Sequence, residues 1–112
     1  MKKEYRPWGY YEVLLDEPNY KVKRITINPK CRLSKQSHEL RDEYWVVVDG
    51  YGIVTRDNDR IYCSIGYDIN IPKNTIHRAE NIEENDFVFI ETQIGKCIEN
   101  DVVRLEDDYN RI

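Results

Sequence analysis

The sequence has little of the material from which helices, membrane spans or disulfide frameworks are built. It contains one alanine, Ala79, and five leucines, against twenty-two valine and isoleucine residues. Because β-branched side chains suit a pleated surface better than a helix, this imbalance predicts an ordered, mostly β domain. No apolar run approaches the roughly 20 residues that a transmembrane helix needs, so a membrane protein is not expected.

Cysteine is also scarce. Cys31, Cys63 and Cys97 are odd in number and widely spaced, which indicates neither a disulfide framework nor a zinc site of paired cysteines. Free thiols, together with a charged N-terminus that lacks the apolar stretch of a signal peptide, predict a cytoplasmic protein. The net charge of −4 argues against nucleic acid as the main partner.

What the sequence does contain is a succession of short strand-like segments. Its 112 residues suffice for one domain, and turn signals recur about every 8 to 12 residues, as in a sandwich or small barrel. Strands are predicted over 10–15, 20–27, 44–48, 53–55, 61–63, 67–71 and 87–94, and a short helix over 100–108. We divide the single domain 1–112 into an N-terminal arm with the first strand (1–19), a barrel core (20–98) and a C-terminal tail (99–112).

The only two histidines, His38 and His77, lie where they could converge. Gln36 precedes His38 by two residues and shares its face on a strand, while Glu43 lies at the start of the next strand. Pro72 precedes His77 and places it near the start of a further strand. Two imidazoles, a carboxylate and an amide oxygen would suit a divalent transition metal with positions left open for substrate. Without further signals, surface or core histidines are the commoner outcome.

The spacing around both histidines resembles the cupin superfamily. Its first motif, G-x5-H-x-H-x4-E-x6-G, is matched at His38, Glu43 and Gly50, with Lys30 and Gln36 at the first two positions. Its second motif, G-x5-P-x-G-x2-H-x3-N, is matched throughout except at Asn74, and its five positions are Gly66, Pro72, Asn74, His77 and Asn81. We expect Asn74 to tolerate a left-handed conformation and the turn at Lys30 to use ordinary dihedral angles. The resemblance implies a small double-stranded β-helix, or jelly-roll-like barrel.

A closer resemblance covers nearly the whole chain. The sequence is similar to the C-terminal cupin domain of bacterial bifunctional mannose-1-phosphate guanylyltransferase/mannose-6-phosphate isomerases, the type II phosphomannose isomerases. The similar stretches are RPWGYYEVL (6–14), YKVKRITINP (20–29), LSKQSHELRDEYWVVVDG (33–50), IPKNTIHRAEN (71–81) and ETQIGKCIENDVVRLEDDYNR (91–111). In that family a glutamine stands where other cupins have their first histidine. Glu39 and Leu40 depart from it, since they replace its usual run of histidines.

This resemblance implies a metal-dependent enzyme that interconverts mannose-6-phosphate and fructose-6-phosphate in the synthesis of polysaccharide precursors. The implied metal ligands are Gln36, His38, Glu43 and His77. The ligand set does not identify the native metal, so Zn, Co, Mn, Ni and Fe all stay open. By resemblance to small cupins, we also expect a homodimer.

Isomerisation needs a base near the C2 proton of the sugar. Because both histidines are assigned to the metal, the candidate bases are carboxylates, a lysine or metal-bound water. Glu43 is one candidate at the edge of the ligand set. Glu91 is another, because it shares a strand face with Phe87, Phe89 and Gln93, although a solvated strand face is an equal alternative.

The substrate phosphate needs a cationic anchor. Lys21 and Lys23 share a strand face with Ile25 and Ile27 and would point to the barrel mouth. The alternative is a solvated edge strand, on which lysines discourage aggregation. Arg41, in a turn near the ligands, is a third candidate. Tyr5, Arg6 and Trp8 are assigned to a structural N-terminal arm.

Two other functions compete with the isomerase hypothesis. One is a non-catalytic, metal-bearing cupin that binds sugars or regulates a partner. The other is an isomerase or epimerase acting on a different sugar phosphate or nucleotide sugar. The sequence contains no nucleotidyltransferase segment, so a role with sugar nucleotides would need a separate guanylyltransferase.

Overall fold

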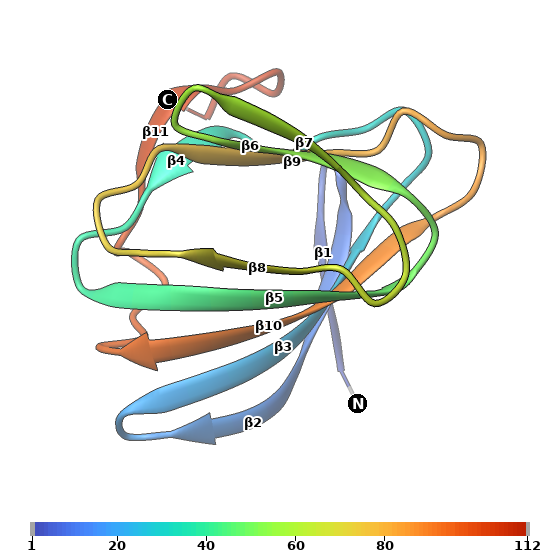
Figure 1. Cartoon of the computed structure of the whole chain (residues 1–112). Coiled ribbons are helices and arrows are strands. Elements are labelled where there is room, and N and C mark those ends of the chain that lie inside the picture. The colour runs from blue at the N-terminus through green and yellow to red at the C-terminus, as the bar shows by residue number, and fades with distance from the viewer. Residues whose placement is uncertain (1, 112) are drawn as a thin grey trace.

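Two antiparallel β-sheets face each other across the core of the protein (Figure 1). The computed structural model describes residues 2–111. Its strands are β1 (Lys3–Arg6), β2 (Gly9–Glu17), β3 (Tyr20–Ile27), β4 (Lys35–Ser37), β5 (Arg41–Asp49), β6 (Gly52–Arg56), β7 (Asp59–Cys63), β8 (Asp68–Ile71), β9 (His77–Glu80), β10 (Phe87–Gly95) and β11 (Val103–Glu106). One sheet has the order β1-β2-β3-β10-β5-β8, and the other has the order β11-β4-β9-β6-β7. The predicted all-β barrel is confirmed.

The core is built from the inward positions of alternating strands. Phe87 and Phe89 on β10 are fully buried, and the ring of Phe89 stacks on Trp45 of β5 with 4.4 Å between the ring centroids. The second sheet contributes the buried Val54 of β6 and Ala79 of β9. Residues between these positions face outward, which is the period of two expected of strands covered on one side.

Along the buried face of the neighbouring strands β3, β10 and β5, the side chains are apolar at one end and polar at the other. On β10, Phe87 and Phe89 give way to Glu91 and Gln93, all of them buried. The register places Glu91 opposite Lys23 of β3 on one side and Trp45 on the other. One end of the barrel is therefore an apolar core, while the other is a polar interior. Burying charges is unfavourable unless they are paired or bind a ligand, so the polar end is where a functional site is expected.

The predicted helix over 100–108 is wrong. Residues 103–106 form β11, an edge strand that pairs antiparallel with β4, with Arg104 opposite Gln36. Two adjacent β-branched residues, Val102 and Val103, favour an extended chain, and β4 offers an unpaired edge for it. The C-terminal tail is thus part of the second sheet.

The expectation of ordinary dihedral angles at Lys30 is also wrong. Its φ angle is 63°, and that of Asn74 is 65°, so both residues adopt the left-handed conformation. These are the two positions at which this chain lacks a glycine of the cupin motifs, and the backbone keeps the left-handed conformation at both without glycine. The backbone N–H of Asn74 donates to the carbonyl oxygen of His38 at 2.7 Å. This bond fixes the turn before His77 against the other histidine.

Among residues 2–111, no helix has the length and apolar character that a bilayer crossing requires.

Candidate metal centre and adjoining cavity

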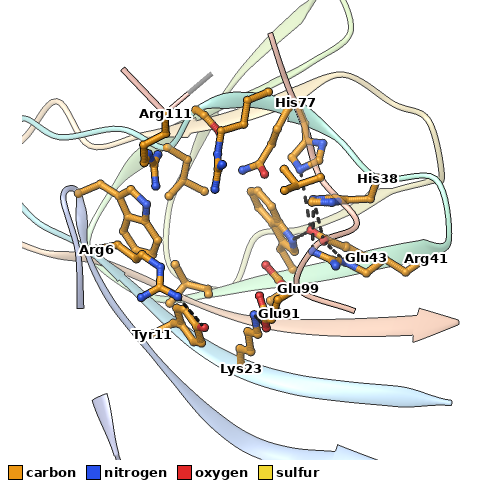
Figure 2. Close-up of a pocket in the computed structure, with 18 residues that line it drawn as sticks. Arg6, Tyr11, Lys23, His38, Arg41, Glu43, His77, Glu91, Glu99 and Arg111 are labelled. Atoms are coloured by element: carbon orange, nitrogen blue, oxygen red, sulfur yellow. Dashed lines mark hydrogen bonds and ion pairs between the residues drawn. The ribbon is translucent and has the colours of Figure 1, made fainter. Parts of the chain in front are cut away.

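His38, Glu43 and His77 converge at the polar end of the barrel (Figure 2). Glu43 comes from β5 in the first sheet, His77 from β9 in the second, and His38 from the connection between β4 and β5. The Nε2 atom of His38 is 3.2 Å from Oε2 of Glu43, and that of His77 is 3.9 Å from Oε1. One ligand atom from each of the three buried residues lies within 4.8 Å of the others. The predicted convergence of these side chains is found.

The orientation of both imidazoles is set by backbone carbonyl groups. Nδ1 of His77 lies 2.9 Å from the carbonyl oxygen of Thr75, and Nδ1 of His38 bonds to the carbonyl oxygen of Asp101. Since a carbonyl oxygen can only accept, Nδ1 is assigned the proton in each ring. Burial is the main cause that lowers the pKa of both imidazoles, which favours their neutral forms. Each Nε2 atom is then an acceptor, and that of His38 lies 3.4 Å from Nη2 of Arg41.

Three acceptor groups therefore face one another in a buried space. The Glu43 carboxylate receives hydrogen bonds from Arg41 Nε at 2.8 Å and from the indole N–H of Trp45 at 3.0 Å. Two imidazole nitrogens facing a carboxylate are favourable only where a positive charge lies among them. This donor set is the one that divalent transition metals prefer, and the hydrogen-bonded Nδ1 atoms are typical of metal-ligating histidines. The residues present fit a bound divalent cation.

Gln36 adjoins this cluster. On β4 it lies directly opposite His77 of β9, and its side chain lines the same cavity. Directly opposite residues of an antiparallel pair have Cβ atoms about 5 Å apart. The four residues predicted as ligands are thus brought together, three in a tight cluster and Gln36 beside them.

The cluster lies in the wall of a cavity of about 110 Å³. Of the other predicted site residues, Lys23, Arg41 and Glu91 line this cavity. Lys21 is buried but does not line it. Arg41 opens strand β5 rather than lying in a turn, and its guanidinium is buried against Glu43. The two lysines do not form a solvated strand edge.

Glu91 is buried, with 7% of its surface exposed. Its Oε1 accepts a hydrogen bond from the side-chain amide of Gln93. Among residues 2–111 no other hydrogen bond or ion pair reaches this carboxyl group. Burial, followed by repulsion from Glu43, raises its pKa from 4.5 to about 7. Glu91 therefore differs from Glu43, whose two oxygens are both engaged by other side chains.

The segment 96–102, between β10 and β11, closes over the polar end of the barrel. Glu99 accepts from Nζ of Lys23 at 2.7 Å and lies 3.6 Å from Nζ of Lys21. The side chain of Asp101 accepts from the backbone N–H groups of Glu39 and Leu40, both at 2.9 Å. The C-terminal part of the chain thereby completes the site. No pattern in the sequence predicted these contacts.

Two further groups of cavity residues escaped the sequence interpretation. Arg6 and Trp8 belong to the site as well as to the N-terminal arm, because both line the cavity. Arg104 of β11 and Arg111, which follows it, line the cavity from the C-terminal side. The placement of the first pair could have been suspected from the RPWG stretch at 6–9. That of the second pair depends on the strand that was mistaken for a helix.

Comparison with known proteins identifies the relatives of this chain. Residues 1–107 match the family model described as mannose-6-phosphate isomerase C-terminal. The chain is 39% identical over 111 residues to the xanthan biosynthesis protein XanB of Xanthomonas campestris pv. campestris, covering 98% of this chain and 24% of XanB. It is 41% identical over 109 residues to mannose-1-phosphate guanylyltransferase of Escherichia coli K12, covering 96% of this chain and 23% of that protein. The chain spans about a quarter of the length of these relatives.

Solved structures with the same fold have diverged further in sequence. KdgF from Halomonas sp. superposes with a TM-score of 0.80 at 18% identity, over 86% of this chain and 89% of KdgF. The capsular polysaccharide assembling protein CapF from Staphylococcus aureus superposes with a TM-score of 0.80 at 20% identity, over 95% of this chain and 32% of CapF. Another similar structure, from Klebsiella pneumoniae, is described as a double-stranded β-helix domain, with a TM-score of 0.74 at 17% identity over 85% of this chain and 82% of that one. These likenesses show the fold alone.

Proposed function

The chain belongs to the mannose-6-phosphate isomerase C-terminal family, and on that premise we propose that it is a metal-dependent isomerase interconverting mannose-6-phosphate and fructose-6-phosphate. The observation that carries the proposal is the buried cluster of His38, Glu43 and His77 beside a cavity lined by Glu91, whose carboxyl group has one oxygen without a hydrogen bond. A metal site and a base are the two parts that an aldose–ketose isomerisation requires.

In this proposal His38, Glu43 and His77 hold a divalent cation, with Gln36 as the fourth ligand. When bound, the cation supplies electrophilic stabilisation of the negative charge that develops on the sugar oxygens at C1 and C2. Arg41 and Trp45 hold the Glu43 carboxylate in place through their hydrogen bonds to it. Glu43 is therefore committed to ligation and not to proton transfer.

Glu91 is the base. Its Oε1 is fixed by Gln93, so its second oxygen is available to take the proton from C2 of the open-chain sugar and return it to C1. A pKa raised to about 7 suits this task, because the group can both accept and release a proton near neutral pH. The segment 96–102 covers part of this site through the contacts of Glu99 and Asp101.

A coupled isomerase assay tests the proposal. We expect the chain to convert mannose-6-phosphate to fructose-6-phosphate when Zn²⁺, Co²⁺ or Mn²⁺ is present, and to lose activity in excess chelator. Metal added back beyond the chelator should restore the rate. The absence of turnover with every metal would contradict the proposal, and a panel of other sugar phosphates would then show whether a different substrate is used.

We also propose that two copies of the chain pair through the outer face of the first sheet. On this face β5 exposes Tyr44, Val46 and Val48, each more than 40% exposed, and Ile94 of β10 is 47% exposed. A second copy presents the same apolar surface, so a symmetric pair would cover both. Light scattering should give twice the chain mass of 13.5 kDa for the wild type. The variant Val46→Asp should have the mass of a single chain. A wild-type mass near 13.5 kDa at micromolar concentration would contradict this pairing.

A further inference from the structure

We infer that Arg6, Arg104 and Arg111 form an anion site for the phosphate group of the substrate, at the end of the cavity remote from the histidines. All three side chains line the same cavity as His38 and Glu43. In Figure 2, Arg6 and Arg111 lie on one side of the cavity, while His38, Glu43 and Arg41 lie on the other. The inference rests on the proposed function for the identity of the substrate, but the anion site itself does not depend on turnover.

The charges within the cavity single out two of these arginines, Arg6 and Arg104. Lys23 is paired with Glu99, and Arg41 with Glu43, so each of these cations already neutralises a carboxylate of the protein. Arg6 and Arg104 have no carboxylate partner within 4.0 Å in the described part of the chain. Arg104, which is partly buried, and the exposed Arg6 thus leave positive charge at this end of the cavity, and that charge favours an anionic ligand.

Arg104 carries the more specific signal. Its Nε atom is buried and has no hydrogen-bond partner among residues 2–111. Buried polar groups are nearly always paired, so an orphan donor on a side chain that lines the cavity indicates an absent acceptor. Guanidinium groups bind phosphate oxygens through two parallel hydrogen bonds, which makes a phosphate oxygen the fitting acceptor.

The other two arginines are held in place before any ligand binds. Arg111 bonds through Nε and Nη2 to the carboxylate of Asp107, whose side chain is fully buried, at 2.8 and 2.9 Å. Arg6 donates from Nη2 to the hydroxyl group of Tyr11 at 3.2 Å, and from Nη1 to the carbonyl oxygen of Tyr5 at 2.8 Å. Each guanidinium still has N–H groups that these bonds do not use. Fixing a cation in advance reduces the entropy lost when the ligand binds.

The separation of the two ends matches the length of a hexose phosphate. In the second sheet Arg104 lies opposite Gln36, and Gln36 lies opposite His77, so the three occupy one row across adjacent strands. Neighbouring strands are about 4.8 Å apart, which places the backbones of Arg104 and His77 roughly 10 Å apart. A six-carbon chain extends about 6 Å, since each C–C bond of about 1.5 Å advances it by roughly 1.3 Å. With the sugar oxygens at C1 and C2 beside the histidines, a phosphate on C6 would reach Arg104.

Titration of the metal-free protein with inorganic phosphate, in chelator, tests the anion site without any catalysis. We expect wild-type protein to bind phosphate, and Arg104→Gln and Arg6→Gln each to weaken that binding at least tenfold. The control is Arg60→Gln on β7, whose side chain is 60% exposed and outside the cavity; it should bind like the wild type. In the isomerase assay, Arg104→Gln should raise the KM for mannose-6-phosphate more than it lowers kcat.

Each outcome bears on the inference separately from the proposed function. Phosphate binding that is lost in Arg104→Gln supports the anion site even if no isomerase activity is found with any metal. Wild-type affinity for phosphate in both arginine variants would overturn the site, as would an absence of phosphate binding by the wild type. Thermal melts of the variants identify a folding defect in one of them. If Arg104→Gln proves to be misfolded, the phosphate affinity of Arg6→Gln tests the anion site, because Arg6 is exposed and carries no ion pair with a described residue.

Discussion

Replacing His77 with leucine is expected to abolish isomerase turnover and the binding of a divalent cation. His77 is 1% exposed, and its Nε2 faces the Glu43 carboxylate. Leucine fills a similar volume but offers no nitrogen to a cation, and it gives up the hydrogen bond from Nδ1 of His77 to the carbonyl oxygen of Thr75. Loss of electrophilic stabilisation of several kcal/mol corresponds to a decrease of about 10³-fold or more in kcat/KM.

Thermal melts with and without Zn²⁺ test the predicted loss of cation binding in His77→Leu. In the wild type, metal should raise the free energy of unfolding by about 3 kcal/mol at 100 times its dissociation constant, whereas His77→Leu should show no shift. Trp45→Phe is the matched control, because it removes one hydrogen bond to Glu43 and leaves all three ligands. It should weaken metal binding without abolishing it. A metal-induced shift of wild-type size in His77→Leu would show that this residue is not a ligand.

Replacing Glu91 with glutamine is expected to lower kcat by about 10²- to 10⁴-fold with metal binding retained, the range that a positioned base contributes. In the wild type the rate should rise with pH, because only the deprotonated carboxylate accepts a proton. Its pKa of about 7 applies to the metal-free protein, and a bound cation would move the inflection to lower pH. The pH–rate profile of Glu91→Gln should lack this inflection. If that variant keeps wild-type kcat, the base is another group.

The stability of the metal-free protein gives an independent readout of the same group. The pKa of Glu91 is raised in the folded state, from 4.5 to about 7, so the folded protein holds this proton more tightly than the unfolded chain. Stability should therefore fall as pH rises between these two values, by about 3 kcal/mol from this group alone. Glu91→Gln should lack that decrease and be more stable than the wild type at pH 8.

Glu12→Gln is the matched control for both measurements. Glu12 is also a buried carboxylate, but its two oxygens accept from Arg24 at 2.9 Å, outside the cavity. The hydrogen bonds from Arg24 lower its pKa. Its contribution to stability is therefore present above its ordinary pKa and lost in acid, the opposite sign to Glu91. The variant should lose stability at neutral pH and keep its isomerase activity.

Strand periodicity in the sequence predicted the inner faces of the long strands. Glu43 and Trp45 on β5, and Glu91 with Phe89 on β10, lie on the buried faces that alternation assigns to them. The metal cluster was implied by the resemblance of the motif spacing to the cupin superfamily. Strand periodicity alone would not have placed His38, which was expected on a strand face with Gln36 but lies beyond the end of β4. The structure brings these side chains together, and their roles as ligands and base stay proposals.

The anion-site arginines could not be predicted in the same way. Arg6 and Arg111 come from opposite ends of the sequence, and no local periodicity links them. The position of Arg104 depends on which edge β11 joins and in which register, and its pairing with β4 contains an irregularity between Arg104 and Glu106. Short segments have weak local preferences, so the tail was mistaken for a helix when pairing with β4 decided its conformation. Lys30 is similar, because the surrounding fold imposes its left-handed angle.

The partners that orient the two imidazoles are carbonyl groups of the main chain, at Thr75 and Asp101. Tautomer selection is therefore encoded in the path of the backbone and not in the identity of any side chain. Substitution at position 75 leaves the orienting carbonyl in place, so a mutational scan of single side chains will not detect it there. A substitution of Asp101 will have an effect only through loss of the hydrogen bonds that its side chain accepts from the backbone of residues 39 and 40. Relatives can thus exchange residues at both positions and still hold both rings in the same orientation.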